Sequence, residues 1–249
     1  MSEPAAPQAV MAAGAGQGSG SAAPGWRRWC GLRGPRWWPG GWGAGVQAPP
    51  RWVVLDVESS GLDPLRDRLL AIAAVAVEVA PGRPHIACAD SFEVLLGHPA
   101  AQAAGAPVDK ANILVHGLGV GAQARGTAPA PALQAFEAWV AGAPCVGFHV
   151  DFDRVLIERA FRQHLGRVPG GQWLDLEPLA ALSRPGAPRQ PLDGWLADYG
   201  IPCAARHQAA ADALATAELL LRLWPFLVSE RATTLRACQQ LAARRRWLG

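Results

Sequence analysis

The sequence predicts an α/β domain built around a mixed β-sheet, and three observations lead to this prediction. Three apolar segments of strand-like composition follow one another over residues 52–96. Beyond them, segments with helical apolar spacing alternate with a short apolar strand at 145–148. Half of the 249 residues are hydrophobic and 17% are charged, which is enough apolar material for a buried core and excludes a wholly disordered protein.

The first three predicted strands form an antiparallel meander. Residues 52–57 are apolar and rich in β-branched side chains, as in a buried strand. Gly61 and Pro64 then mark a turn. Residues 68–79 and 85–96 provide the second and third strands. Consecutive strands joined by short connections usually pair as neighbours, so an antiparallel arrangement is expected.

Two amphipathic helices are predicted on either side of the short strand. Residues 131–140 place Leu133, Phe136 and Val140 on one helical face. Residues 152–164 show the same kind of apolar spacing after the strand. A helix, a strand and a second helix in this order are expected to pack against a sheet.

Shorter helices are predicted at three further places. The first lies in a loop-rich stretch that runs through residues 114–117. The other two span 176–182 and 192–199, and Gly200 follows the last of them as a C-terminal cap signal.

The last part of the chain is predicted to hold two longer helices. An Ala- and Leu-rich helix runs over 208–223 and is ended by Pro225. Ser229 is placed to cap a final helix that runs to Arg246. The basic end of that helix suits the negative C-terminal end of the helix dipole.

Composition divides the chain into an N-terminal extension, a folded domain and a C-terminal helix. Residues 1–50 are an extension, rich in Ala, Gly and Pro and predicted to be disordered before a Trp/Arg-rich segment at 26–50. Residues 51–227 form the folded domain, and residues 228–249 form a helix packed on it. We interpret the Trp/Arg-rich segment as an incidental extension. Binding to single-stranded nucleic acid, or to an anionic membrane surface or a partner, stays open.

Charge, cysteine content and the lack of long apolar segments indicate in which cellular compartment the protein is found. The net charge is +3, and its positive balance lies in the extension, so the folded region is neutral. The five cysteines form no CxxC pair, which is typical of reduced thiols rather than of a disulfide framework or a zinc site. The N-terminus lacks the pattern of a signal peptide, and the longest apolar stretch, 69–77, is too short to cross a bilayer. The sequence therefore predicts a cytoplasmic protein without stable membrane association.

A pair of carboxylates lies at the end of the first predicted strand. Asp56 and Glu58 are two residues apart, and the period of a strand places both on one face. Two like charges this close repel and need a counter-charge. A divalent cation such as Mg²⁺ or Mn²⁺, which prefers oxygen ligands, is one solution; a solvated or salt-bridged pair with a structural role is the other.

Two more carboxylates and a histidine strengthen the case for a site. Asp153 opens a helix after a buried strand, where it could also serve only as a helix-start carboxylate. Asp212 lies among alanines in a helix, where it could also be only an exposed charge. His207 precedes Asp212 by five residues, so the two would point about 140° apart if both were helical. Placing His207 just ahead of the helix lets both side chains reach one cleft.

Three segments carry a family resemblance. They are 53–63 (VVLDVESSGLD), 146–153 (VGFHVDFD) and 206–217 (RHQAAADALATA), and a fourth, shorter match is VHG at 115–117. In order and spacing they resemble the motifs of the DnaQ-like (DEDDh) 3′–5′ exonucleases, a family that includes the proofreading epsilon subunit of bacterial DNA polymerase III. The resemblance extends over residues 52–227.

The resemblance implies a fold, a cofactor and a mechanism. The fold would be ribonuclease-H-like, with a mixed five-stranded sheet flanked by helices. Two divalent metal ions, Mg²⁺ or Mn²⁺, would be held by the four carboxylates of the motifs, which are Asp56, Glu58, Asp153 and Asp212. His207 would be the general base in the hydrolysis of a phosphodiester. The terminal nucleotide would contact residues of the loop after the first strand and two histidines, which are Ser59, Ser60, Gly61, Leu62, His116 and His149.

The expected substrate is a DNA 3′ end, single-stranded or frayed, from which nucleoside monophosphates are released in proofreading, repair or clean-up. RNA trimming by the same chemistry is an alternative, because recognition of the 2′-hydroxyl depends on details of the pocket. A non-catalytic nucleic-acid-binding scaffold is a second alternative, against which the complete set of five site residues argues. A DNA polymerase is a candidate partner, and a stand-alone enzyme is equally compatible with the sequence.

Overall fold

The computed structural model describes residues 50–79, 83–97, 117–188 and 190–244. The disorder and the Trp/Arg-rich segment predicted for the N-terminal extension, apart from residue 50, lie outside the described residues. Among the residues that are described, none of the helices combines the length and the apolar composition needed to span a membrane.

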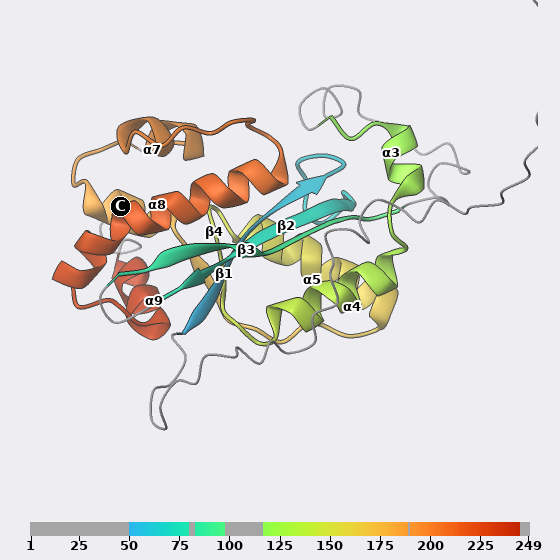
Figure 1. Cartoon of the computed structure of the whole chain (residues 1–249), viewed down its shortest axis with the longest axis horizontal. Coiled ribbons are helices and arrows are strands. Elements are labelled where there is room, and N and C mark those ends of the chain that lie inside the picture. Colours follow the sequence, from blue (N-terminus) through green and yellow to red (C-terminus); the bar gives the residue numbers. More distant parts are fainter. Residues whose placement is uncertain (1–49, 80–82, 98–116, 189, 245–249) are drawn as a thin grey trace, which may run out of the picture. The chain divides into compact units, whose positions relative to one another are not determined.

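Five strands of the described chain form one mixed sheet (Figure 1). They are β1 (Arg51–Ser59), β2 (Leu69–Glu78), β3 (His85–Leu95), β4 (Cys145–Gly147) and β5 (Trp173–Asp175). The strand order is β3-β2-β1-β4-β5. The pairs β1–β2 and β2–β3 are antiparallel, whereas β4 pairs in parallel with both β1 and β5. The predicted meander and the mixed five-stranded sheet are confirmed.

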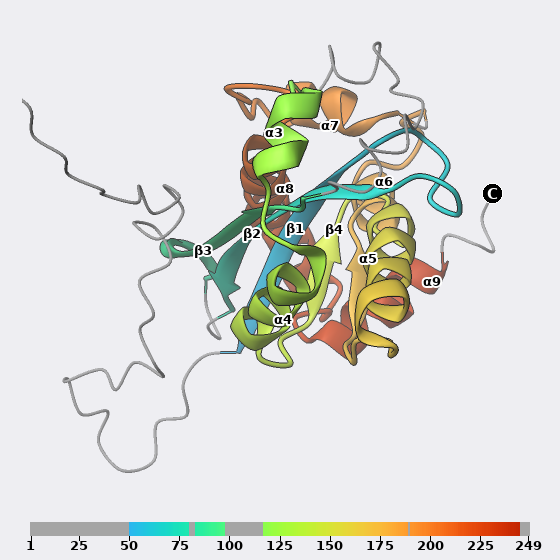
Figure 2. The same ribbon diagram turned by 90° about the vertical axis from the view of Figure 1, so that its right-hand side faces the viewer.

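Helices cover both faces of this sheet. They are α3 (Val120–Arg125), α4 (Pro129–Val140), α5 (Asp151–Leu165), α6 (Glu177–Ser183), α7 (Leu192–Asp198), α8 (Ala209–Ser229) and α9 (Leu235–Arg244). Figure 2 shows α5 and α8 on opposite sides of the sheet. The predicted amphipathic helices therefore exist, with ends displaced by one or two residues in α4 and α5.

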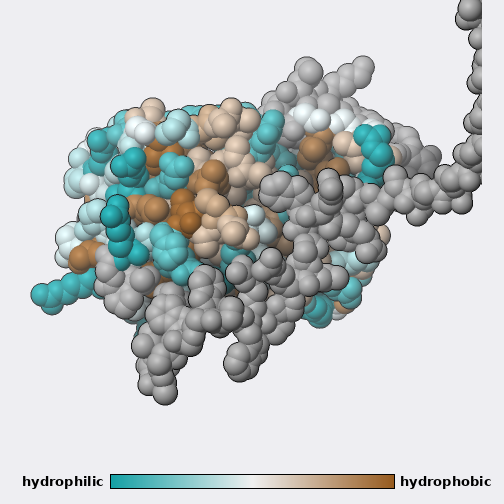
Figure 3. Space-filling model, viewed as in Figure 1, coloured by the Kyte–Doolittle hydropathy of each residue, from teal (hydrophilic) through white to brown (hydrophobic). Residues whose placement is uncertain are grey.

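The alternation of side chains along β1 separates two hydrophobic cores. Val53 and Leu55 point into a core shared with α4 and α5. Trp52 and Val54 point into a second core, shared with α6, α7, α8 and α9. The face of the described chain seen in Figure 3 groups hydrophobic residues toward its middle, with hydrophilic residues around them. Because β1 is buried on both faces, it forms the rigid centre from which the site is built.

Pro225 lies inside α8, so the prediction that this proline ends the helix is wrong. Proline removes one backbone hydrogen bond of a helix and costs about 3 kcal/mol in a helix interior. Trp224 and Leu227 beside it are buried, and burial stabilises such side chains by about 2 kcal/mol each. Pro225 itself is exposed. The burial of its neighbours therefore outweighs the lost bond, and α8 continues to Ser229.

The predicted cap of the final helix is also wrong. Ser229 is the last residue of α8, and its hydroxyl donates a hydrogen bond to the carbonyl oxygen of Phe226 at 2.7 Å. The final helix, α9, begins at Leu235, and Thr234 Oγ1 accepts a hydrogen bond from the backbone N–H of Ala237 at 3.3 Å. A threonine hydroxyl in this position satisfies one of the free N–H groups of the first turn.

The final helix packs against the edge of the sheet. Cys238 and Leu241 of α9 are buried, and the helix contacts β5 and α6. Gln239 Nε2 donates a hydrogen bond to the carbonyl oxygen of Trp173 on β5 at 3.0 Å. The predicted end of this helix at Arg246 lies outside the described residues, and the proposed division of the chain into 51–227 and 228–249 stays a prediction.

Substituting Phe161 is expected to destabilise the fold strongly. The side chain lies on α5, is 0% exposed and belongs to the core between α5 and the sheet. Phe161→Ala would leave a cavity and lower the free energy of unfolding by about 3–5 kcal/mol. Urea denaturation followed by circular dichroism measures this change. A loss below about 1 kcal/mol would contradict the core described here.

Candidate active site

The first two candidate ligands lie on the face of β1 that α8 covers. Asp56 and Glu58 alternate in phase with Trp52 and Val54, whose side chains point into the core beneath α8. Both acidic residues are half-buried. The small side chains of α8, such as Ala213, let this helix lie close to β1. The expectation that both carboxylates share one face is confirmed.

Backbone groups tie the three sequence motifs together. The backbone of Val57 on β1 acts on the carboxylate of Asp153, which is buried in the first turn of α5, and lowers its pKa through hydrogen bonding. The backbone of Ala209, the first residue of α8, lowers the pKa of Glu58 in the same way. β1, α5 and α8 are thus joined at the positions that carry the candidate ligands.

Asp212 is buried in the first turn of α8, so it is not an exposed helix charge. Its Oδ2 accepts a hydrogen bond from the backbone N–H of His207 at 2.9 Å. Its Oδ1 accepts a hydrogen bond from the Arg206 guanidinium, which also pairs with Asp193 of α7. Sγ of Cys203 lies 3.5 Å from the same oxygen. Asp212 therefore holds the loop that precedes its own helix.

His207 stands just ahead of α8, as predicted. Gln208 is the N-cap residue and Ala209 the first helical residue. His207 is exposed and has a φ of 60°, a left-handed conformation that is uncommon outside glycine but in which histidine, asparagine and aspartate are enriched. The hydrogen bond from its backbone N–H to Asp212 holds this conformation. The imidazole is left accessible beside the carboxylates.

The carboxylates share an environment that disfavours their charges. Burial and the carboxylates of Asp153, Asp212 and Glu58 raise the pKa of Asp56 well above its usual value. Burial and Asp212 raise the pKa of Glu58 to about 7. Burial is the main cause that raises the pKa of Asp153 to about 8, with contributions from Asp175 and Glu58. The positive charge of Arg206 lowers the pKa of Asp56 and Glu58, but by less than burial and the other carboxylates raise it.

This environment fits divalent cations. All four donors are hard carboxylate oxygens, the type that Mg²⁺ and Mn²⁺ prefer. Glu58 Oε1 is buried and has no hydrogen-bond partner among the described residues. Within the described ranges, no three acidic, histidine or cysteine side chains already stand where they would enclose one ion. Binding would therefore require side-chain rotation, and Asp212 would have to share its charge between Arg206 and the cation.

The loop after β1 uses its polar groups internally. Ser59 Oγ donates a hydrogen bond to the carbonyl oxygen of Gly61 at 2.5 Å. Ser60 Oγ donates to Asp67 Oδ1 at 2.9 Å and accepts from the backbone N–H of Arg68 at 2.9 Å. Leu62 projects outward and is 89% exposed. Of the predicted substrate contacts in this loop, the leucine is thus the one that is free to meet a ligand through its side chain.

Two histidines are the remaining predicted substrate contacts, and the structure describes one of them, His149. His149 follows β4, is exposed and has a φ of 56°. Its backbone N–H donates a hydrogen bond to Asp175 Oδ1 at 2.9 Å. His116 lies outside the described residues.

Two charged residues near the site were missed at the sequence level. Asp175 ends β5, contributes to the raised pKa of Asp153 and accepts hydrogen bonds from the N–H groups of His149 and Glu177. β5 has only three residues and could not be recognised in the sequence, so nothing there indicated Asp175. Arg206 precedes His207, but its pairing with Asp212 and Asp193 depends on the fold and gives no signal in the sequence.

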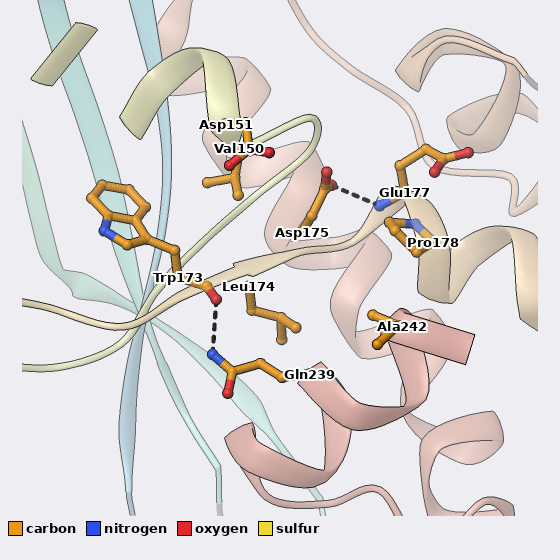
Figure 4. A pocket seen from close by; sticks show the side chains of 10 residues that line it. Val150, Asp151, Trp173, Leu174, Asp175, Glu177, Pro178, Gln239 and Ala242 are labelled. Carbon is orange, nitrogen blue, oxygen red and sulfur yellow. Dashed lines mark hydrogen bonds between the residues drawn. The ribbon is translucent and has the colours of Figure 1, made fainter. Parts of the chain in front are cut away.

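A pocket lies at the edge of the sheet, around β5 (Figure 4). It has a volume of about 480 Å³ and is bordered by α5, β5, α6 and α9. Asp175 lines it, whereas Asp56, Glu58 and Asp212 do not. This pocket therefore shares Asp175 with the surroundings of Asp153 and is not centred on the four carboxylates.

The pKa values predict how the metal-free protein responds to pH. Glu58 and Asp153 have folded-state pKa values of about 7 and about 8, above those of the unfolded chain, so folding favours their protonated forms. The stability that they contribute is complete at low pH and is lost as the pH rises through the folded-state values. The melting temperature in EDTA should fall by about 5 °C or more between about pH 5 and about pH 8.5.

Differential scanning fluorimetry checks this prediction, with Glu58→Gln as the control that removes one of the titrating groups. The variant should show a shallower fall than the wild-type protein. Added Mn²⁺ should raise the melting temperature more at the upper end of the pH range than at the lower end, because the ionised carboxylates bind the cation. A melting temperature in EDTA that rises with pH for both proteins would contradict the electrostatics described above.

No family model matches the chain. The "DNA polymerase III subunit epsilon-like protein" of Rhodobacter capsulatus is 32% identical over 189 residues, which are 75% of this chain and 25% of that protein. A crystal structure of E. coli exonuclease I in complex with a dT13 oligonucleotide superimposes with a TM-score of 0.57 and 19% identity, over 73% of this chain and 44% of that one. Exonuclease I from Methylocaldum szegediense gives a TM-score of 0.55 and 20% identity, over 73% and 43% of the two chains.

The chain shares the ribonuclease-H-like fold of exonuclease I. In sequence it is similar to the epsilon-like protein of Rhodobacter capsulatus. It spans a quarter of the length of the curated relative and less than half of the exonuclease I chains. What those longer proteins do is therefore carried to this chain only as a proposal.

Proposed function

We propose that this chain is a metal-dependent 3′–5′ exonuclease that releases nucleoside monophosphates from a DNA 3′ end. The observation that carries the proposal is the set of four carboxylates that β1, α5 and α8 bring into mutual electrostatic contact, with His207 beside them. The similarity to an epsilon-like protein supports it, and so does the fold shared with exonuclease I.

The carboxylates would hold two divalent ions, Mg²⁺ or Mn²⁺. Asp56, Glu58, Asp153 and Asp212 are the residues that would do so. The ions would supply an activated water and a counter-charge for the leaving 3′ oxygen.

His207 would take a proton from the attacking water while the oxygen of that water forms a bond to phosphorus. The bond from phosphorus to the 3′ oxygen of the preceding nucleotide would break, and that oxygen would take a proton from solvent to become the new 3′ hydroxyl. A histidine is suited to this role because its usual pKa lies close to neutral pH. The exposure of His207 leaves its imidazole accessible to a water molecule and a scissile phosphate.

DNA is the proposed substrate because exonuclease I, whose fold this chain shares, is seen in complex with a dT13 oligonucleotide. A single-stranded or frayed end fits best, because a paired terminal nucleotide is held away from the carboxylates by its stacking and its partner strand. RNA trimming is the alternative with the same chemistry. A DNA polymerase partner and a cytoplasmic location stay predictions from the sequence.

The polarity of degradation tests the proposal. Single-stranded DNA labelled at its 5′ end should shorten one nucleotide at a time in the presence of Mg²⁺, and the same strand with a blocked 3′ hydroxyl should persist. An RNA strand of the same sequence measures the preference between the two sugars. Cleavage inside the strand, or removal of nucleotides from the 5′ end, would refute the proposed polarity.

A further inference from the structure

The loop between β1 and β2 presents two large apolar side chains to solvent. Leu62 is 89% exposed and Leu65 is 72% exposed. Single exposed leucines are ordinary on protein surfaces, but two on one short turn form an apolar surface that loses free energy when it is covered. The loop begins two residues after Glu58, so it continues the strand that carries two of the four carboxylates.

The loop is ordered from within by one carboxylate. Asp67 accepts hydrogen bonds from the hydroxyl of Ser60 and from the backbone N–H of Asp63, both at 2.9 Å. Gly61 packs so closely on it that a Cβ at residue 61 would lie 2.5 Å from Asp67 Oδ2. The leucines therefore project from a turn that the Asp67 carboxylate braces from inside.

The loop is also held from outside by Arg159 of α5. One of its two terminal nitrogens donates a hydrogen bond to the carbonyl oxygen of Pro64. The other donates to the carbonyl oxygens of Arg66 at 3.3 Å and of Asp67 at 2.6 Å. One guanidinium thus bonds three carbonyl oxygens of the loop, one before Leu65 and two after it.

Arginine suits the contact between residue 159 and the loop better than lysine would. A guanidinium carries five N–H donors in a rigid plane, so it can bond several carbonyl oxygens at once, whereas the ammonium of lysine is a compact point charge. Arg159 lies on α5, the helix that carries Asp153. The loop and a candidate metal ligand are therefore held by one rigid element.

We propose that Arg159 is a positioning residue for substrate: it holds loop 60–68 so that Leu62 and Leu65 contact the unpaired bases at the 3′ end. This inference rests on the proposed exonuclease function and adds Leu65 and Arg159 to it. A loop fixed before binding loses less conformational entropy when the nucleic acid arrives, so the gain is in binding rather than in the chemical step.

The kinetic test compares Arg159→Met and Arg159→Lys with Arg162→Met as the matched control. Arg162 lies on the same helix and pairs only with Glu158 among the described side chains. Arg159→Met should raise KM for single-stranded DNA about tenfold and change kcat less than about twofold. Arg159→Lys should lie between the wild type and Arg159→Met, and Arg162→Met should match the wild type.

A second measurement separates loop order from general stability. Trypsin cleaves after arginine, and the side chain of Arg66 in this loop is 88% exposed. Arg159→Met should speed cleavage after Arg66 under native conditions, whereas Leu65→Ser should leave the rate unchanged. Leu65→Ser should nevertheless raise KM, and the double variant should raise it by less than the product of the two single effects, because both act on one contact.

The outcomes distinguish the two proposals. An inactive wild-type protein on DNA and RNA would remove the proposed function and this inference with it. An active wild type whose KM is unchanged by Arg159→Met and by Leu65→Ser would overturn this inference alone. A loop that is cleaved faster in Arg159→Met while KM stays constant would also overturn it, because the ordered loop would then have no part in binding.

Discussion

Asp56→Asn is expected to abolish the exonuclease activity and, at the same time, to stabilise the metal-free protein. The amide keeps the shape of the side chain but removes a charge that burial and three other carboxylates disfavour. Loss of a metal ligand should lower kcat by about a thousandfold or more, which corresponds to about 4 kcal/mol of transition-state stabilisation. The melting temperature in EDTA above neutral pH should rise by a few degrees.

Activity and stability therefore move in opposite directions, which separates a functional carboxylate from one that only supports the fold. Asp90 provides a matched control, because it pairs with Arg51 at the sheet edge, at 2.6 Å. Asp90→Asn should leave kcat unchanged and lower stability by less than about 1 kcal/mol. An Asp56→Asn variant that is both active and less stable than the wild type would show that Asp56 has a structural role.

His207→Asn is expected to lower kcat by about a hundredfold to ten-thousandfold, the range typical of a lost general base. Asparagine is the appropriate replacement because it tolerates the left-handed conformation that His207 adopts, so the loop before α8 should keep its shape. The N–H of residue 207 would still donate to Asp212. The melting temperature should therefore stay close to that of the wild type.

The pH dependence of kcat distinguishes the proposed base from a merely structural histidine. The pH profile of the wild-type protein should contain a step that belongs to the general base, and His207→Asn should lose that step. His149→Asn is the matched control, since His149 is also exposed and left-handed but is not the proposed base. Equal rates and equal pH profiles for wild type and His207→Asn would exclude this histidine as the base.

The parts of the site that depend on local periodicity could be predicted from the sequence. The two-residue period of a strand correctly placed Asp56 and Glu58 on one face of β1. Helix geometry correctly placed His207 before the helix that carries Asp212. Both inferences need only the backbone geometry of one element, and that geometry is fixed by the nearby residues.

The parts that depend on packing between distant segments could not be predicted in the same way. β5 has three residues, too few to show a period, and it is a strand because it pairs with β4. The bonds from Arg159 to the loop after β1 join residues more than 90 positions apart. Pro225 is a further example. Its local tendency to end a helix is outweighed by the burial of Trp224 and Leu227 in the core, which a local sequence pattern does not reveal.

The most direct test of the central claim is metal add-back to EDTA-treated protein with single-stranded DNA, with released products measured by mass spectrometry. We expect no product in EDTA, and deoxynucleoside 5′-monophosphates within seconds to minutes of adding Mg²⁺ or Mn²⁺. Asp212→Asn should stay inactive under both conditions. Product formation in EDTA, or an Asp212→Asn variant as active as the wild type, would contradict a metal site built from these carboxylates.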